Sequence, residues 1–304
     1  MGRKTILITG SNGLLGQKLI SQLKDTEIFN LIATSLGANR NEELPIRNYH
    51  SLDITRPFEV KKLFQSLKPD IVINTAAMTN VDACESSKEA CWELNVMAVK
   101  HLVEACADIN AHLIQLSTDF VFDGEDGPYD ESAQPNPISY YGESKWAAEK
   151  IIQKSNLKKW SIARTIILYG YTEGMSRSNV VLWAKEALEK GEPINVVDDQ
   201  FRSPTWADDL ADGCIRIAAQ NALGIYHLSG KETMSILELV FKVGEFFKLD
   251  TSMINPIKSN TLGQAAKRPP RTGFNISKAI NKLGYKPKSF IEGLKLLNQQ
   301  LASK

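Results

Sequence analysis

The chain alternates short runs of β-branched and other apolar residues with longer segments whose apolar positions recur at helical spacing. The apolar runs predict strands at residues 4–9, 29–34, 49–52, 71–75, 112–117 and 160–168. Helical spacing predicts one helix at 14–23, directly after a glycine-rich turn, and another at 88–107. Strands and helices that alternate in this way favour βαβ units, and therefore a doubly wound parallel sheet of the α/β class.

The alternation loosens after Tyr169. Helices are predicted at 180–188 and 236–247, short strands at 194–198 and 224–229, and two more helices follow the basic stretch KRPPRTGF. We therefore predict a first domain over residues 1–168, with returning segments around 193–222, and a smaller, interleaved lobe over 169–304.

Composition excludes several classes of protein. The chain has 36 Lys and Arg against 35 Asp and Glu, a net charge of +1, so no charge bias points to nucleic acid or an anionic membrane as a partner. No run approaches the ~20 apolar residues of a membrane span. The four cysteines form no CxxC pair and no metal-like cluster with the four histidines. We expect reduced thiols, a cytoplasmic location and no metal site.

A glycine triplet marks the first predicted strand-to-helix turn. Gly10, Gly13 and Gly16 stand in the stretch TILITGSNGLLGQKLI. Glycines permit a tight turn and let the backbone approach a pyrophosphate, while the helix N-terminus offers free N–H groups. Glycine turns also end many strands that bind nothing, but the position at the first βα turn favours a dinucleotide site.

The end of the second predicted strand indicates which nicotinamide cofactor is preferred. A carboxylate there would bind the ribose 2′-hydroxyl of NAD, but the stretch ATSLGANR contains no acid. Ser35 and Arg40 offer instead a hydroxyl and a guanidinium for a 2′-phosphate. The alternative is that Arg40 is a solvated loop charge. We predict NADPH as the preferred cofactor, with NADH as the other candidate.

Two tyrosines precede a lysine in YYGESK, and helical geometry separates their roles. At about 100° per residue, Tyr141 and Lys145 lie about 40° apart, whereas Tyr140 lies about 140° from Lys145 on another face. An ammonium beside a phenol would stabilise the phenolate and lower the pKa of Tyr141. We therefore predict Tyr141 as the acid that protonates a carbonyl oxygen during hydride transfer, with Lys145 beside the nicotinamide ribose.

A hydroxyl-bearing strand end supports this prediction. Ser117 and Thr118 follow the apolar run HLIQL, at the carboxyl end where open α/β sheets bind ligands. Thr118 could donate a hydrogen bond to the substrate oxygen. Asp119, beside it, is a further candidate for substrate binding. The alternative is that both residues only form the turn, as Thr and Asp commonly do.

Several motifs together resemble one known family. LDIT (52–55), KPDIVINTAAMTNVDACE (68–85), ELNVMAV (93–99), STDFVFDG (117–124) and YGESKWAAE (141–149) are similar to the dTDP-4-dehydrorhamnose reductases. These belong to the extended short-chain dehydrogenase/reductase superfamily. The resemblance covers nearly the whole chain. It implies a Rossmann-type domain, a small nucleotide-sugar lobe, and reduction of a 4-keto sugar by NAD(P)H.

The resemblance also implies roles for particular residues. The catalytic residues would be Thr118, Tyr141 and Lys145. The cofactor phosphates would lie against Asn12, Gly13 and Leu14, the adenine against Asp53 and Ile54, and the ribose and nicotinamide beside Ala76, Ala77 and Met78. The last three are small or apolar, as close backbone approach requires, although a buried strand end would also select such residues.

Two departures from the family pattern affect substrate and metal. Ile167 stands where relatives have an aromatic residue after the motif that begins Arg164-Thr165, which leaves the sugar nucleotide open. Gln17 and Lys18 stand where some relatives have a glutamate linked to a magnesium-bridged dimer, so no metal is implied.

Two arginines are the candidates for binding the substrate diphosphate. They are Arg202 in DDQFRSPT and Arg268 in KRPP, although each could be a surface charge. Trp206 could stack on a base or belong to the core.

Three functions remain open. The first is an NADPH-dependent reductase of a nucleotide-linked 4-keto-6-deoxy sugar, most simply dTDP-4-dehydrorhamnose, and the second is a related sugar-nucleotide reductase or epimerase. The third is a non-catalytic NADP-binding subunit, since the chain also resembles the β-subunit of methionine adenosyltransferase. A catalytic tyrosine with its lysine favours an enzyme. A nucleotide sugar is the expected partner, and a homodimer is the default assembly.

Overall fold

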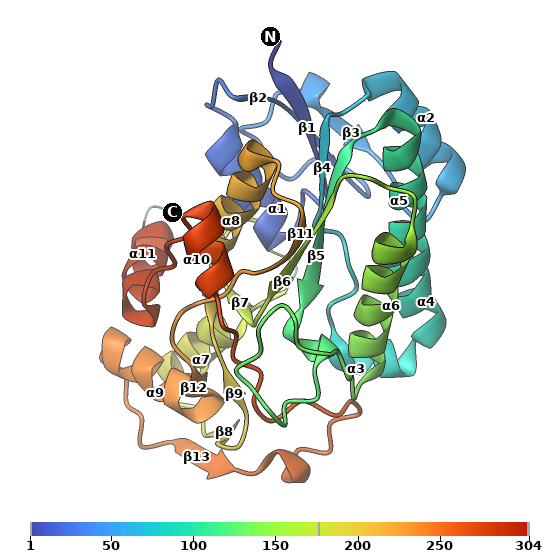
Figure 1. Ribbon diagram of the computed structural model, residues 1–304. Helices are drawn as coiled ribbons and strands as arrows, with labels where there is room; N and C mark the ends of the chain where they lie inside the picture. Colours follow the sequence, from blue (N-terminus) through green and yellow to red (C-terminus); the bar gives the residue numbers. More distant parts are fainter. Residues whose placement is uncertain (1, 176, 303–304) are drawn as a thin grey trace.

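A seven-stranded sheet forms the centre of the computed structural model, which describes residues 2–175 and 177–302 (Figure 1). Its strands are β1 (Lys4–Thr9), β2 (Phe29–Ser35), β3 (Tyr49–Ser51), β4 (Ile71–Asn74), β5 (His112–Thr118), β6 (Trp160–Thr165) and β11 (Gly224–His227). Their order is β3-β2-β1-β4-β5-β6-β11, and every neighbouring pair is parallel. The predicted α/β fold with a parallel sheet is confirmed. The strand order reverses between β1 and β4, which places the ligand crevice beyond their carboxyl ends.

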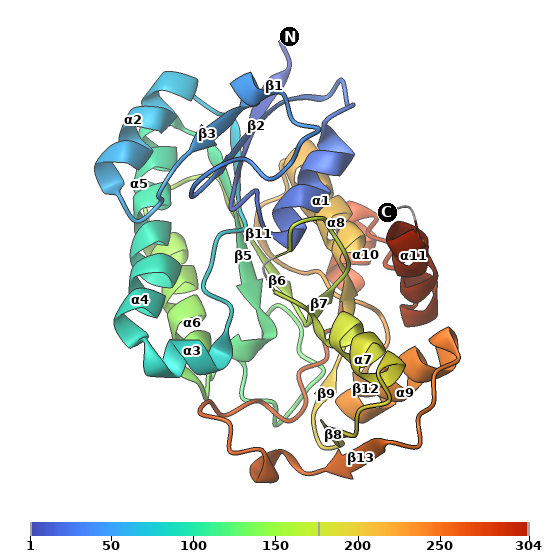
Figure 2. The same ribbon diagram turned by 180° about the vertical axis from the view of Figure 1, so that it is seen from behind.

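Helices cover both faces of this sheet (Figures 1 and 2). One face carries α2 (Pro57–Leu67), α5 (Ala98–Ile109) and α6 (Tyr140–Lys154), and the other carries α1 (Leu14–Leu23), α8 (Ala207–Gln220) and α10 (Ser277–Leu283). In β1, Ile6 and Ile8 belong to the apolar core under α1 and α8, whereas Leu7 belongs to the core under α2 and α5. Both neighbours of Leu7 face the opposite way because successive strand side chains alternate.

The helix predicted at 88–107 is helical throughout but contains an irregular turn. It comprises α4 (Lys88–Trp92), a π-helical turn η2 (Glu93–Met97) and α5. The turn presents Asn95, whose side chain accepts from the backbone N–H of Met78 at 2.8 Å and donates to its carbonyl at 3.0 Å. The irregular turn therefore holds the segment after β4, which the sequence predicts to pass beside the cofactor.

The strand predicted at 160–168 is interrupted. β6 ends at Thr165, and β7 (Leu168–Tyr169) pairs with β10 (Thr205–Trp206) outside the central sheet. Between them Ile167 has a φ of 22°, a value that β-branched residues rarely adopt. The break lets the chain leave the sheet at its carboxyl edge.

The rest of the chain forms a lobe beyond the carboxyl end of β5 (Figure 1). It contains α7 (Val180–Glu189), α9 (Ile236–Phe247), the parallel pair β8 (Ile194–Val197) and β13 (Ile254–Ile257), and the antiparallel pair β9 (Phe201–Arg202) and β12 (Met234–Ser235). The C-terminal helix α11 (Phe290–Ala302) packs on α9 and shares the apolar core of this lobe. The remaining short elements are α3 (Val81–Ser86), η1 (Ile46–Asn48), η3 (Asp119–Val121) and η4 (Ser259–Thr261).

The elements that follow α7 divide between the lobe and the central sheet. β8 pairs with β13 in the lobe, whereas α8 packs beside α1 and β11 joins the edge of the sheet at β6.

Over the described residues, no helix is long and apolar enough to span a membrane.

Candidate active site

A cleft of about 700 Å³ lies between the carboxyl edge of the sheet and the lobe. Ten residues that the sequence proposed for a site line it: Asn12, Gly13, Leu14, Ala77, Thr118, Asp119, Tyr141, Lys145, Arg202 and Arg268. The cleft runs from the N-terminus of α1, past the end of β5, to the start of α7. It therefore joins the predicted cofactor turn to the predicted catalytic helix.

The glycine turn fits a dinucleotide diphosphate. Gly10 has a φ of 70°, and a Cβ there would lie 2.6 Å from the backbone nitrogen of Ala76. A Cβ on Gly16 would lie 2.5 Å from the carbonyl oxygen of Gly10, so α1 can approach the turn only with glycine at this position. Gly13, the N-cap of α1, supplies no side-chain cap, and the first turn has no acid. The N–H groups at this helix end are therefore available to an anion.

Ser11, in the same turn, has a buried hydroxyl with no hydrogen-bond partner among the described residues. Buried polar groups are normally paired, so this hydroxyl also favours a ligand in the turn.

Asn12 links this turn to the loop after β2. Its side chain donates to the carbonyl of Ala38 at 2.8 Å and accepts from the backbone N–H of Arg40 at 3.0 Å. The guanidinium of Arg40 is exposed and lies 3.4 Å from the carbonyl oxygen of Gly174. Asn12 thus positions the loop that carries Arg40, the residue proposed to bind the 2′-phosphate. The local sequence did not indicate this role of Asn12.

Most of the other proposed cofactor residues lie outside the lining of the cleft. Asp53 accepts hydrogen bonds from the backbone N–H and the hydroxyl of Thr55, at 3.0 and 2.7 Å, just before α2. Ser35 ends β2, and Ile54 is buried. Of the segment after β4, Ala77 lines the cleft, whereas Ala76 and Met78 do not.

Thr118, Tyr141 and Lys145 converge at the centre of the cleft. α6 begins at Tyr140 because Ser139 caps it, accepting from the backbone N–H of Gly142 at 3.2 Å. The hydroxyl of Thr118 lies near the phenol of Tyr141, which brings α6 to the end of β5. The ammonium of Lys145 donates to the carbonyl of Leu116 at 2.8 Å, and the residue is 3% exposed.

Burial dominates the ionisation of these groups. It raises the pKa of Tyr141, against the opposing effect of the nearby Thr118 hydroxyl. It lowers the pKa of Lys145 to about 8. The expectation that Lys145 lowers the phenol pKa is wrong in this structure, because the desolvation of the phenolate outweighs it and the amine is directed at a carbonyl. Tyr141 is consequently held as a neutral phenol that can donate its proton.

Tyr140 lies outside the cleft lining, in agreement with its predicted helix face. Its ring packs against Trp92, with centroids 6.2 Å apart, and the ammonium of Lys88 lies 5.0 Å from its centroid. Tyr140 therefore belongs to the packing between α4 and α6.

The two arginines proposed for the diphosphate are engaged by the protein. Arg202, 3% exposed, donates to the carbonyl oxygens of Phe201 at 2.8 Å and Pro269 at 2.6 Å. Arg268 forms an ion pair of 2.6 Å with Asp82. Both side chains thus hold the 268–271 segment against the cleft instead of presenting a free cation.

Arg177 is the cation that the sequence analysis missed. It lines the same cleft just before α7, is exposed, and makes no hydrogen bond or ion pair with the described residues. No motif marks it in the sequence, because its position on the cleft follows from the way the lobe folds back.

Asp119 and Trp206 are also enclosed. Asp119 accepts from the hydroxyls of Thr118, at 3.0 Å, and Thr272, and burial raises its pKa. Trp206 is 3% exposed and packs on Tyr169, so it belongs to the core and is not available to stack on a base.

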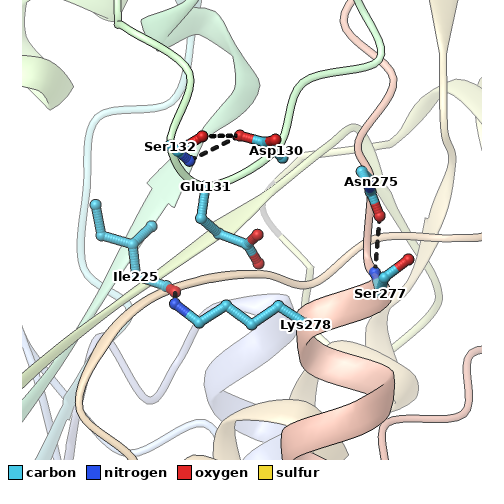
Figure 3. Close-up of a pocket in the computed structure, with 7 residues that line it drawn as sticks. All are labelled: Asp130, Glu131, Ser132, Ile225, Asn275, Ser277 and Lys278. Atoms are coloured by element: carbon cyan, nitrogen blue, oxygen red, sulfur yellow. Dashed lines mark hydrogen bonds between the residues drawn. The ribbon is translucent and has the colours of Figure 1, made fainter.

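A second, more open hollow of about 520 Å³ lies at the β11 edge of the sheet (Figure 3). Its polar groups are largely paired with one another: Asp130 accepts from Ser132, Lys278 donates to the Ile225 carbonyl at 2.6 Å, and the Asn275 side chain accepts from the Ser277 N–H. The larger cleft is therefore the candidate active site. Among the described residues no group of three or more His, Cys, Asp or Glu side chains could hold a metal ion.

The doubly wound sheet, with its glycine turn and a Tyr-x-x-x-Lys helix on a shared cleft, defines the class: extended short-chain dehydrogenase/reductases, which are NAD(P)-dependent oxidoreductases. Residues 4–303 match the family described as "RmlD substrate binding domain", and the chain belongs to that family.

Relatives of known structure and name resemble the whole chain. The crystal structure of a dTDP-4-dehydrorhamnose reductase from Clostridium acetobutylicum superposes with a TM-score of 0.87 at 30% identity, covering 98% of this chain and 99% of that one. The Bacillus anthracis dTDP-4-dehydrorhamnose reductase, solved in complex with NADP, gives a TM-score of 0.85 at 28% identity with the same coverage. Methionine adenosyltransferase 2 subunit beta of Xenopus tropicalis is 32% identical over 288 residues, covering 93% of this chain and 83% of that protein.

Proposed function

We propose that the protein reduces the keto group of a nucleotide-linked 4-keto-6-deoxy sugar with NADPH. The first candidate reaction converts dTDP-4-dehydrorhamnose to dTDP-L-rhamnose. One observation carries the proposal: the Tyr141 phenol, the Thr118 hydroxyl and the Lys145 ammonium meet on the cleft that reaches the N-terminus of α1. A dinucleotide held at that helix end can extend to the same point as a sugar ketone.

The roles of the residues follow from this arrangement. NADPH, when bound, supplies the hydride. Tyr141 donates its proton to the ketone oxygen, and the Thr118 hydroxyl donates a hydrogen bond that stabilises the negative charge developing there. Lys145 supplies a positive charge in the same cleft and binds the ribose hydroxyls.

The cofactor site extends from the glycine turn along the edge of the sheet. Gly10, Gly13, Gly16, Asn12 and Leu14 hold the diphosphate, Ser35 and Arg40 the 2′-phosphate, Asp53 and Ile54 the adenine, and Ala76, Ala77 and Met78 the ribose and nicotinamide. The NADP complex of the Bacillus anthracis relative supports NADPH as the cofactor. We also propose that residues 1–168, with α8, α10 and β11, form the cofactor domain and that the other residues of 169–304 form the substrate lobe.

The substrate side includes Thr118, Asp119, Arg202 and Arg268, and Arg177 supplies the free cation for the diphosphate. Arg177→Ala should raise KM for the nucleotide sugar on the order of tenfold, because a charge-assisted contact with phosphate is lost, and leave the Kd of NADPH unchanged. Lys267→Ala, which removes an exposed cation outside the cleft lining, is the matched control. An unchanged KM in Arg177→Ala would remove Arg177 from the site.

The decisive experiment supplies NADPH with dTDP-4-keto-6-deoxy-L-mannose and follows the loss of NADPH absorbance. GDP- and UDP-linked 4-keto sugars are the comparators, because Ile167 leaves the nucleotide and sugar open. The Tyr141→Phe variant controls for background oxidation. Turnover with the dTDP sugar supports the first candidate, and turnover with a comparator alone reassigns the substrate. The absence of turnover with all three contradicts the reductase function.

A second candidate is a subunit that binds NADP and acts through a partner enzyme. The similarity to methionine adenosyltransferase 2 subunit beta favours it. Mixing the protein with a methionine adenosyltransferase and measuring co-elution and the activity of that enzyme tests this candidate. A cytoplasmic location and a homodimer complete the proposal, and light scattering tests the homodimer.

A further inference from the structure

A buried ion pair lies behind the catalytic residues, and the mechanism above leaves it without a role. Glu149 in α6 is 0% exposed and Arg164 in β6 is 1% exposed. The Glu149 carboxylate accepts from Arg164 Nε at 2.9 Å and from Nη2 at 2.6 Å. Burying both charges carries a large desolvation cost, and a pair of packed apolar residues would often be as stable. The presence of this ion pair beside the site therefore calls for an explanation other than stability.

Arg164 is held in place from its other side. Its Nη1 lies 3.4 Å from Nε2 of His227, whose Nδ1 lies 3.2 Å from the carbonyl oxygen of Tyr129. Burial lowers the pKa of His227 to about 3, so this ring is neutral, donates from Nδ1 and accepts at Nε2. His227 therefore offers no negative charge to balance the guanidinium of Arg164. Among the described residues, Glu149 is the only carboxylate that pairs with this guanidinium.

Glu149 also links α6 to the strand that carries Thr118. It stands four residues after Lys145, on the same face of the helix. Ser117 donates to Glu149 at 2.6 Å, and Lys145 donates to the carbonyl of Leu116 at 2.8 Å. Two consecutive residues of β5 are thus bound by two successive turns of α6, immediately before Thr118. These contacts set the position of the helix against the strand.

The charge of Glu149 acts on Lys145. Burial disfavours the ammonium, and among the groups that oppose this effect Glu149 is the strongest, followed by Cys91 and Cys84 from α4 and α3. Burial raises the pKa of the Cys84 thiol, which is therefore uncharged at neutral pH.

The remaining groups around the lysine do not replace this carboxylate. Tyr141, on the same helix, is a neutral phenol because burial raises its pKa. Asp119 lies beyond Thr118 and is engaged with Arg202, 3.8 Å away, and Arg164 itself is a cation. Glu149 is thus the carboxylate that favours a charged Lys145.

We propose that Glu149 is a positioning residue for the reduction: it keeps Lys145 charged and, through Ser117, keeps α6 in place against β5. The proposal rests on the proposed function, because it assigns Glu149 a role in that same reaction. Lys145 must carry a proton to act, so activity falls as pH rises through its pKa of about 8. This alkaline limb of the pH profile of kcat/KM reports the charge on Lys145.

Two opposite substitutions separate an electrostatic role from a merely structural one. Glu149→Gln removes the negative charge that most favours the Lys145 ammonium, so it should move the alkaline limb to lower pH. Arg164→Met removes a positive charge and should move the limb to higher pH. Both break the same ion pair, so a purely structural role predicts no opposite movement. Ser117→Ala, which removes a hydrogen bond but no charge, should leave the limb in place.

A second readout does not depend on turnover. Lys145 can be titrated in the substrate-free protein by NMR of isotopically labelled lysine, with Lys145→Arg used to assign its signal. The titration midpoint should fall in Glu149→Gln and rise in Arg164→Met. If wild type turns over no sugar nucleotide while these midpoints move as stated, the proposed reductase function fails and the control of Lys145 by Glu149 stands.

Removing one partner of a buried pair can prevent folding. The double variant Glu149→Gln with Arg164→Met leaves no unpaired charge, and comparison with Arg164→Met alone isolates the effect of the carboxylate. A lower midpoint in the double variant supports the proposal. Equal midpoints in these two proteins, or shifts of the same sign in both single variants, would overturn it.

Discussion

Gly142→Ala tests whether the contact between α6 and the end of β5 sets the catalytic geometry. Gly142 follows Tyr141, and a Cβ at this position would overlap the carbonyl oxygen of Phe120 and lie 3.0 Å from Cβ of Pro137. The Phe120 carbonyl belongs to the 3₁₀ turn η3 directly after Thr118. The obstruction is backbone, so the helix has to move away.

The size of the effect follows from that movement. Relieving the overlap requires a separation of about 1 Å between α6 and η3, because carbon and oxygen atoms make favourable contact only at about 3.5 Å. A misplacement of this size can cost about 10² in rate, so kcat should fall on the order of 100-fold. Alanine favours a helix over glycine by about 1 kcal/mol, and overpacking costs about 1–3 kcal/mol, so the free energy of unfolding should change by less than about 2 kcal/mol.

Steady-state oxidation of NADPH with the nucleotide sugar measures kcat, and urea denaturation measures stability. Gly213→Ala in α8 is the matched control, because its Cβ would meet the side-chain methyl groups of Leu228, 2.8 and 3.1 Å away, and neither residue lines the cleft. That variant should retain the kcat of wild type. A kcat in Gly142→Ala within about twofold of wild type would refute the geometric argument.

Three further predictions concern acid, cofactor and pH. Tyr141→Phe should lower kcat by on the order of 10² or more with the Kd of NADPH nearly unchanged, and a larger loss in Tyr140→Phe would contradict the assignment. Arg40→Ala should raise the Kd of NADPH and not that of NADH in fluorescence titrations, and equal effects would exclude a 2′-phosphate contact. Burial lowers the pKa of His112 to about 4 and of His227 to about 3, so both stay neutral when folded. As pH falls from about 6.5 to 5, histidines of the unfolded chain become protonated while the folded ones stay neutral. Urea denaturation should therefore show the free energy of unfolding falling by up to about 1.4 kcal/mol per pH unit for each histidine. A free energy of unfolding that does not change over this pH range would be inconsistent with two buried neutral histidines.

Local periodicity accounts for the parts of the fold that were predicted well. The helix predicted at 14–23 coincides with α1, and the apolar run at 236–247 coincides with α9. These segments have the apolar spacing of an amphipathic helix and begin beside a glycine turn or a serine cap. The same geometry separated Tyr141 from Tyr140, because a helix face depends only on the spacing of residues along one element.

Features that the sequence did not reveal depended on distant partners. Arg268 is engaged by Asp82, 186 positions away in the chain, and Thr272 by Asp119, 153 positions away. Neither pairing leaves a local pattern, so the sequence could not show that these side chains were already occupied. The break at Ile167 was missed for a similar reason, since a run of β-branched residues predicts a continuous strand.

By itself the sequence determined the parallel sheet, the glycine turn and the helix face that presents Tyr141, because each of these depends on spacing within a few turns or one strand. Only the tertiary structure decided which of the cations that line the cleft are engaged by other protein groups, that burial keeps the Tyr141 phenol neutral, and that Glu149 pairs with Arg164 behind Lys145. These properties depend on desolvation and on contacts between separate elements, and both arise only when the chain has folded.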